Sequence, residues 1–162
     1  MGNLPLKRDK RFHQGYFRAR NPDKIIGKDP VIFRSKIEYL FLLYLDKNDN
    51  VKRWSSESII IPYFDKVTNK NRKYYTDCYV EIMEGSVLKK YIIELKDIKE
   101  TKAPNPKSKK KKASLLFEQC RYITNICKWE FANEYAKRNN VEFMLIGYSK
   151  KNGFEHISLD FE

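Results

Sequence analysis

Two apolar segments that each end in charge constrain the fold of this chain most strongly. Residues 74–77 end in an aspartate, and residues 91–96 pass from an aromatic and β-branched run into charged side chains. A turn-like stretch at residues 84–86 lies between them, so the two segments predict neighbouring strands of a hairpin. Because side chains at positions i and i+2 of a strand share a face, we expect Glu94 and Lys96 to point the same way.

The predicted hairpin brings carboxylates and an ammonium group together. Asp77 and Glu94, with Lys96 beside them, can hold a hard divalent cation and a water molecule directed at a phosphate. The alternative is a simple ion pair between Glu94 and Lys96 on a solvent-exposed face. Ile92 and Ile93 are consecutive apolar residues, which indicates a strand covered on both faces. Burial of the glutamate favours a metal-binding or catalytic role for it.

The charge balance favours a polyanionic partner. The 162-residue chain carries 33 Lys and Arg against 21 Asp and Glu, a formal net charge of +12 at pH 7. Such an excess is typical of nucleic-acid binding, although scattered surface lysines on a soluble protein give the same count. Three cysteines without C-x-x-C spacing and two histidines argue against a disulfide scaffold, a zinc site or a histidine-centred nuclease.

Length and hydropathy predict one folded domain that does not enter a membrane. Hydrophobic residues make up 41% of the chain, enough for one core at this length. No apolar stretch approaches the roughly 20 residues that span a bilayer, and the first residues lack an apolar signal core. We divide the chain into a basic N-terminal arm over residues 1–30 and a domain over residues 31–162.

Hydrophobic periodicity predicts an α/β core. A first helix begins near Ser35, which has capping-box spacing to Glu38. The expected elements after it are strands at 51–64, 74–83 and 87–96, a helix at 114–138 and a strand at 141–148. This order predicts a central mixed sheet of about four strands flanked by helices. Residues 154–162 are either an extra strand or a tail.

Three details of these elements are open to test. The first strand is expected to stop at Pro62, because proline cannot donate to a sheet ladder, and residues 65–73 are expected to form a polar hairpin loop. The apolar face of the long helix is expected to consist of Leu116, Cys120, Ile123, Cys127 and Phe131, widened by Tyr122, Ile126 and Trp129.

A lysine-rich segment precedes the long helix. Residues 101–112 contain two prolines and end in four consecutive lysines, whose mutual repulsion requires an exposed loop. We expect this loop to bind phosphates, with an affinity that falls as salt rises. The expected DNA contacts in this segment are Lys107, Lys109, Lys110, Lys111 and Lys112. The alternative is a solvated loop without a binding role.

The order and spacing of these motifs resemble the PD-(D/E)XK nuclease superfamily, and within it the head-completion nucleases of T-even-like tailed phages. The core of that superfamily runs helix, three antiparallel strands, helix, strand, which implies a restriction-endonuclease-like fold. The matching motifs are residues 15–17, 21–22, 34–38, 54–57, 60–63, 74–77, 94–96 and 125–129. Thr76 replaces the usual proline of the motif and Cys78 a common aromatic, and neither change removes a ligand.

The resemblance implies a role for each candidate residue. Asp77, Glu94 and the Leu95 carbonyl would bind the metal, Lys96 would hold the attacking water, and Glu38 would reach the metal directly or through water. The purely structural alternative for Glu38 is its place in the capping box. Further DNA contacts are expected from Arg34 and Lys128, and auxiliary roles from Gln119 and Asn125.

The resemblance also implies an activity. We expect a Mg²⁺-dependent DNA endonuclease, with Mn²⁺ as a substitute ion and no small-molecule cofactor. It would act in virion assembly at head–tail joining, in the cytoplasm of the host cell, with the virion as the alternative location. Its partners would be DNA and phage head or neck proteins. The alternatives are a non-catalytic basic DNA-binding or virion-assembly protein, and a restriction, repair or transposase-type nuclease of the same fold.

Overall fold

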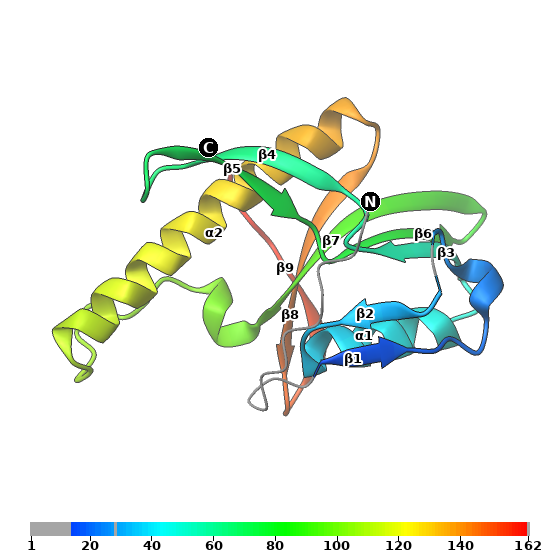
Figure 1. The fold of residues 1–162 in the computed structure, drawn as a ribbon, viewed down its shortest axis with the longest axis horizontal. Helices are drawn as coiled ribbons and strands as arrows, with labels where there is room; N and C mark the ends of the chain where they lie inside the picture. The colour runs from blue at the N-terminus through cyan, green and yellow to red at the C-terminus, as the bar shows by residue number, and fades with distance from the viewer. Residues whose placement is uncertain (1–13, 28, 162) are drawn as a thin grey trace.

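A central mixed sheet organises the molecule. The computed structural model describes residues 14–27 and 29–161, and in that part of the chain the main sheet has five strands in the order β3-β6-β7-β8-β9 (Figure 1). Its strands are β3 (Val51–Ser56), β6 (Cys78–Glu84), β7 (Val87–Asp97), β8 (Glu142–Ser149) and β9 (Gly153–Ile157). Neighbours are antiparallel except β7 and β8, which are parallel because a long helix connects them.

The predicted fold class is confirmed. Helix α1 (Lys36–Lys47), strands β3, β6 and β7, helix α2 (Lys112–Arg138) and strand β8 follow one another in the expected order. This is a restriction-endonuclease-like arrangement. The sheet has one strand more than the four expected, because the C-terminal segment continues into β9 and pairs with β8.

The hairpin expected around residues 65–73 is present, but its insertion between β3 and β6 as a separate ribbon was not predicted. The segment expected as one strand over residues 51–64 divides at Glu57, which has a φ of +50°, and continues as β4 (Ile60–Asp65). Strand β4 pairs with β5 (Lys70–Tyr75) in a two-stranded sheet of its own, so the expected loop over residues 65–73 is mostly strand.

Pro62 does not stop this strand. It lies inside β4 opposite Lys73. The hairpin is a two-stranded ribbon, so each strand has one edge on which a missing N–H costs no ladder hydrogen bond.

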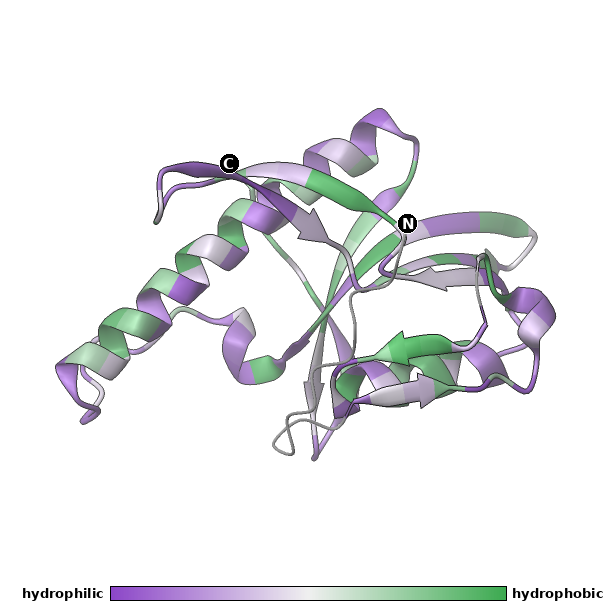
Figure 2. Cartoon of the chain, in the orientation of Figure 1, coloured by the Kyte–Doolittle hydropathy of each residue, from purple (hydrophilic) through white to green (hydrophobic). Residues whose placement is uncertain are grey.

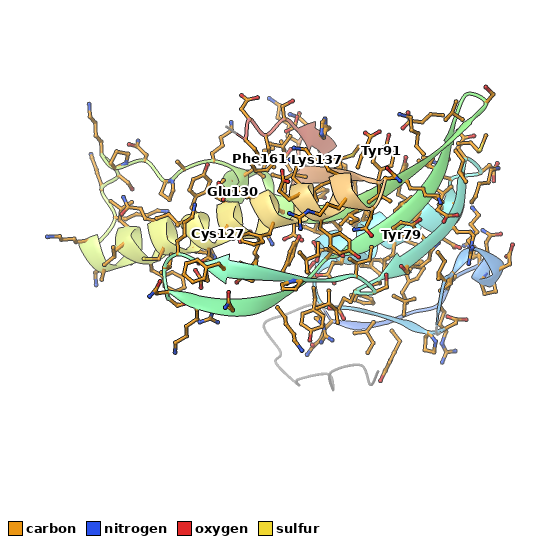
Figure 3. The ribbon with its side chains drawn as sticks, turned by 90° about the horizontal axis from the view of Figure 1, so that it is seen from above. Tyr79, Tyr91, Cys127, Glu130, Lys137 and Phe161 are labelled. Atoms are coloured by element: carbon orange, nitrogen blue, oxygen red, sulfur yellow. The ribbon has the colours of Figure 1, made fainter. Side chains whose placement is uncertain are left out.

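The two faces of the main sheet are covered by different elements. On the α1 face, alternate residues of β7, among them Tyr91, Ile93 and Leu95, join a core that also contains Trp54. On the other face, α2 and the inserted hairpin pack together in a second cluster of Ile61, Tyr63, Tyr74, Cys127 and Ala132. Seen from above, the hairpin runs alongside α2 near Cys127 (Figure 3). Strand β7 is therefore covered on both faces, as expected.

Part of the expected N-terminal arm is folded onto the domain. Strand β1 (Gly15–Phe17) pairs with β2 (Val31–Phe33), and Phe17 lies in the core. The short 3₁₀ helix η1 (Pro22–Lys24) follows, and the backbone amides of Arg20 and Asn21 donate to the buried carboxylate of Asp46. These contacts cross the expected boundary at residue 30. Residues 1–13 of the arm lie outside the described residues.

Helix α2 begins close to the expected residue but buries only part of the expected face, namely Cys127 and Trp129. Its buried residues are Asn125, Cys127, Trp129, Ala132 and Ala136, whereas Leu116, Ile123 and Phe131 are exposed. The first turns of α2 project past the sheet, and Figure 2 shows hydrophobic bands on them. No helix in the described residues has the length and hydropathy needed to cross a membrane.

Candidate active site

The hairpin register places Asp77 and Glu94 opposite each other. Strands β6 and β7 pair Cys78 with Ile93, and one further step of the same register brings Asp77 across from Glu94. Side chains at such positions share a face and have Cβ atoms roughly 5 Å apart. The Asp77 carboxylate accepts a hydrogen bond of 2.7 Å from the Leu95 amide through Oδ2, which fixes it beside the strand. The predicted convergence of the two carboxylates is present.

The Glu94 carboxylate is held at both oxygens. Its side chain is buried, with Oε1 2.7 Å from the Lys96 ammonium and Oε2 accepting a hydrogen bond of 2.5 Å from the Tyr74 hydroxyl. Each carboxylate oxygen can accept a second contact, so these partners orient Glu94 and leave lone pairs available. The predicted pairing of Glu94 with Lys96 exists, but inside the protein rather than on a solvent-exposed face.

Burial and crowding of charge dominate the electrostatics of the site. Burial, together with the negative charges of Glu94 and Glu38, raises the pKa of Asp77 well above its usual value. Burial lowers the pKa of Lys96, but the neighbouring carboxylates of Glu94 and Asp77 outweigh this, so the net pKa lies above its usual value. The two carboxylates therefore favour the charged form of Lys96, and they exceed it in number.

Glu38 lies at the start of α1 and takes part in the cap of that helix. Its amide donates to the Ser35 hydroxyl at 3.1 Å, so Ser35 is the N-cap as predicted. Its carboxylate accepts from the Arg34 amide at 2.7 Å and from the Ser35 hydroxyl at 3.0 Å. Burial raises the pKa of Glu38, and its charge in turn contributes to the raised pKa of Asp77. The cap therefore holds a carboxylate close to the strand ends.

The donor set fits a hard divalent cation. The described residues contain no group of three or more His, Cys, Asp or Glu side chains arranged as metal ligands. Asp77 and Glu94 instead form a pair of carboxylates, with the backbone of Leu95 adjacent to both. Mg²⁺ is commonly bound by one or two carboxylates and retains several waters, whereas zinc prefers a closed set of nitrogen and sulfur ligands. A cation would also offset the burial and the charge of Glu94, which together raise the pKa of Asp77.

Arg34, which was expected to contact DNA, forms an ion pair with Glu57 within the protein. Its guanidinium contacts both carboxylate oxygens of Glu57, with Nε 2.8 Å from Oε1 and a terminal nitrogen 3.3 Å from Oε2. The amide of Glu57 donates to the Asp77 carbonyl, so this ion pair adjoins the site. Glu57 was not singled out from the sequence. The sequence signal that could have identified Glu57 is its place in residues 54–57, one of the motifs that carry the family resemblance.

The expected DNA-binding lysines lie at separate places along α2. Lys107, Lys109, Lys110 and Lys111 are exposed in the loop before the helix, and Lys112 is its first residue. Lys128 is partly buried, with its ammonium 5.9 Å from the ring centre of Tyr63 and 5.6 Å from that of Tyr74. Sixteen residues of helix separate Lys112 from Lys128, a distance of about 24 Å at 1.5 Å per residue.

The auxiliary residues on α2 differ in position. Asn125 is buried and lines a hollow that also contains Lys96 and Lys128. Gln119 is not among the residues that line this hollow. Only Asn125 of this pair is therefore brought next to the candidate site.

Tyr74 was missed as a site residue, although it belongs to the segment that ends in Asp77. A buried tyrosine hydroxyl needs a partner, and here that partner is the Glu94 carboxylate. We expect Tyr74→Phe to reduce the free energy of unfolding by about 1–3 kcal/mol, because a buried carboxylate oxygen loses its donor. Urea unfolding in the presence of a chelator measures this. Tyr75→Phe is the matched control, since Tyr75 is exposed, and equal stability of the two variants would contradict the assignment.

Comparisons with known proteins agree with this geometry. The family model for the TnsA-like endonuclease N terminal matches residues 48–147, which span β3 to β8 and include Asp77, Glu94 and Lys96. A protein of Enterobacteria phage T4, the "Head completion nuclease", is 31% identical over 139 residues, which is 83% of this chain and 90% of that protein. The fold, the strand-end carboxylates and both matches lead to one conclusion: the chain belongs to the TnsA-like endonucleases of PD-(D/E)XK type, and it is a nuclease related to the phage head completion nuclease.

Proposed function

We propose that this chain is a magnesium-dependent DNA endonuclease whose metal site is formed by Asp77, Glu94 and the Leu95 carbonyl. The observation that carries the proposal is the opposition of Asp77 and Glu94 across the β6–β7 hairpin, with Lys96 2.7 Å from Glu94. The net charge of +12 suits a DNA substrate. Mn²⁺ is expected to substitute, since carboxylate, carbonyl and water ligands suit both ions.

The residues around the carboxylates have distinct tasks. A bound cation would polarise the scissile phosphate and acidify a coordinated water. Lys96 is held in place by Glu94, and because an ammonium group has three donors it can also donate to a water or to a phosphate oxygen beside that carboxylate. A preoriented ammonium group in this position stabilises the negative charge that builds on the phosphate during attack. Tyr74 orients Glu94, and Glu38 supplies a further carboxylate next to Asp77.

The proposed biological role is completion of filled phage heads before tail joining. Its support is the similarity to a head completion nuclease along 90% of that protein's length. In this role the chain would act in the cytoplasm of the infected cell and meet head or neck proteins as well as DNA. Addition of the purified chain to heads assembled without it tests the role, with the yield of tailed particles as the readout.

The metal requirement is tested directly with supercoiled plasmid. We expect nicked and then linear DNA with Mg²⁺ or Mn²⁺, and intact plasmid when a chelator is present, because the carboxylate pair alone cannot activate water. Gel electrophoresis over time measures both products. Cleavage that persists in chelator contradicts the proposal, and retarded but uncut DNA under every condition would instead favour a non-catalytic DNA-binding protein.

A further inference from the structure

A hollow between α2 and the inserted hairpin opens next to Lys96. Its volume is about 520 Å³. The helix contributes Phe117, Cys120, Arg121, Thr124, Asn125 and Lys128, and the hairpin contributes Tyr63, Asp65 and Arg72. Lys96 and Glu100 complete the lining. The hollow therefore leads directly from the candidate site towards solvent.

The helical wall of this hollow is a single stripe. Phe117, Arg121, Thr124 and Lys128 recur at intervals of three or four residues, so they lie above one another on one side of α2. The stripe combines an aromatic ring with cations, as do the surfaces on which proteins bind unpaired nucleic acid. It begins on the projecting turns of the helix and ends beside the site.

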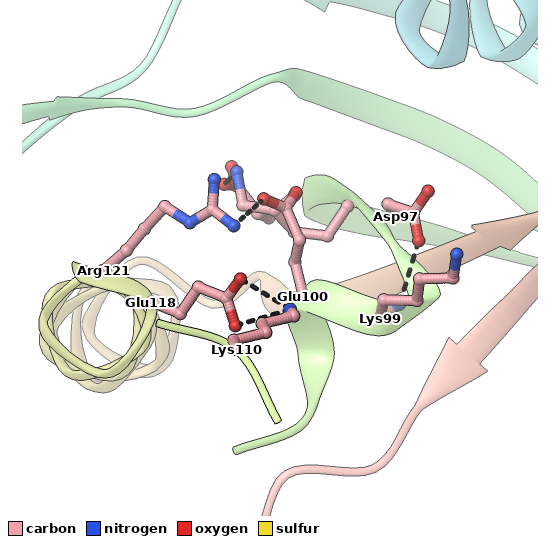
Figure 4. Close-up of polar contacts among 8 residues, drawn as sticks. Asp97, Lys99, Glu100, Lys110, Glu118 and Arg121 are labelled. Atoms are coloured by element: carbon pink, nitrogen blue, oxygen red, sulfur yellow. Dashed lines mark hydrogen bonds and ion pairs between the residues drawn. The ribbon is translucent and has the colours of Figure 1, made fainter. Parts of the chain in front are cut away.

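Charge in the hollow is weighted towards cations. The lining carries four basic side chains against two acidic ones, Asp65 and Glu100. Each acid already has a basic partner, since Arg72 lies 3.2 Å from Asp65 and Arg121 lies 3.0 Å from Glu100. Figure 4 shows Arg121 reaching from α2 to Glu100. Lys96 is balanced by Glu94, and Lys128 contributes positive charge on the side nearest the site, which suits a phosphate.

Phe117, the aromatic residue that lines the outer end of the hollow, belongs to neither hydrophobic core cluster of the described residues. Phe117 is 66% exposed, and the Arg121 guanidinium lies 6.0 Å from its ring centre. In an intact duplex the bases are already stacked on one another, so an exposed ring can stack only on an unpaired or terminal base. A hollow of this volume is in the range that accepts a nucleotide-sized ligand.

From these observations we infer that the hollow binds an unpaired nucleotide next to the scissile phosphate. Its base stacks on Phe117, and its phosphate lies between Arg121 and Lys128. The preferred substrates are accordingly DNA ends, flaps or branches with an unpaired strand, in preference to intact duplex. This inference rests on the proposed nuclease function and adds the class of substrate to it.

Binding measured in chelator tests the inference without requiring cleavage. A blunt duplex and the same duplex with an unpaired overhang are compared by fluorescence anisotropy. Phe117→Ala should weaken binding of the overhang substrate by on the order of ten- to a hundred-fold, because the stacking contact is lost, and change binding of the blunt duplex by less than about two-fold. Phe117→Trp should retain the preference. A fluorescent base analogue in the overhang should be quenched by the unmodified chain and by Phe117→Trp, and not by Phe117→Ala.

Leu116→Ala is the matched control, since Leu116 is 60% exposed on the same helical turn and lies outside the hollow. It should bind both substrates as the unmodified chain does. Equal losses from Leu116→Ala and Phe117→Ala, or an unchanged overhang preference in Phe117→Ala, would overturn the inference. A change in sedimentation in both variants would assign these turns to a protein interface and overturn it as well. If the proposed nuclease function is wrong, metal-dependent cleavage fails in the plasmid assay. The binding results in chelator do not depend on cleavage, so the two failures can be told apart.

Discussion

Asp77→Asn and Glu94→Gln are each expected to reduce divalent-dependent plasmid cleavage by at least about a thousand-fold. Each replacement removes a carboxylate from the proposed metal site, and loss of metal-assisted charge stabilisation is worth several kcal/mol at about 1.4 kcal/mol per ten-fold. Initial rates of nicking measured over a series of Mg²⁺ concentrations give the effect. If either variant cleaves at the unmodified rate at every concentration, that residue is not a ligand.

The same variants should remain folded, because both changes preserve shape. In Asp77→Asn the side-chain amide oxygen can still accept from the Leu95 amide, and the change removes a buried charge that is crowded by Glu94. We therefore expect Asp77→Asn to match or exceed the unmodified melting temperature. Glu94→Gln should lose some stability, since Lys96 then lacks the carboxylate that balances its partly buried ammonium.

Asp97→Asn is the control for these variants. Asp97 is the last residue of β7, and its carboxylate accepts a hydrogen bond of 2.9 Å from the Lys99 amide, so it caps the short helical turn that follows the strand. Its replacement should change the cleavage rate by no more than about two-fold. A large loss of cleavage rate in this variant would show that any substitution at the strand end impairs the protein. The losses at positions 77 and 94 would then give no evidence for metal binding.

The core of the site was predictable because it depends on local rules. Strand alternation alone places Glu94 and Lys96 on one face, and the turn after β6 sets the register that brings Asp77 opposite Glu94. The same is true of the Ser35 cap, which needs only a hydroxyl three residues before Glu38. In each case the partners are close in sequence or joined by one tight turn.

The inserted hairpin was not predicted as a separate ribbon because the chain turns away from the main sheet at a residue type that rarely adopts a positive φ. Glu57 adopts a positive φ without being glycine, and the chain turns there from the main sheet into a separate ribbon. Nothing in the side-chain pattern of residues 51–64 marks that change of direction. The hydrogen bond between Tyr74 and Glu94 depends on it, because the hairpin carries the tyrosine back over the strand end.

The apolar face of α2 was predicted only in part, because periodicity cannot tell which part of a helix is covered. Leu116 and Ile123 have the spacing of a core stripe, yet they are exposed, and the first turns of the helix project beyond the sheet. Burial instead follows the hairpin and the sheet, which enclose Cys127 and Trp129 farther along the helix. The projecting part of the helix is the region in which Phe117 adjoins the candidate site.

Replacing Lys107, Lys109 and Lys111 with glutamine together is expected to flatten the salt dependence of duplex binding. Each lysine that neutralises a phosphate contributes about −0.9 to the slope of log K against log salt, so the slope should fall in magnitude by up to roughly 2.7. At low salt the corresponding loss of affinity is on the order of a thousand-fold. Anisotropy titrations in chelator, repeated at several salt concentrations, measure both quantities. An unchanged slope would show that the loop is merely solvated.

Lys110 gives this prediction an internal control. Its ammonium donates to both carboxylate oxygens of Glu118, at 2.7 and 3.0 Å, so in the absence of DNA it already has an anionic partner (Figure 4). Lys110→Gln should therefore change the slope less than a substitution at Lys109 or Lys111, and Glu118→Gln should steepen it by freeing the ammonium. Lys150→Gln, in the exposed turn between β8 and β9, should leave the slope unchanged.

The distance along α2 also predicts how the effect of the lysines depends on duplex length. The loop lies about 24 Å from Lys128, which corresponds to roughly seven nucleotide steps of 3.4 Å along one strand. The triple lysine variant should therefore lose affinity for duplexes that extend beyond this span on the loop side of the bound site. It should bind shorter duplexes as tightly as the unmodified chain does. A loss that is independent of duplex length would mean that the lysines act through the overall charge of the protein, since direct contacts with phosphates require DNA that reaches them.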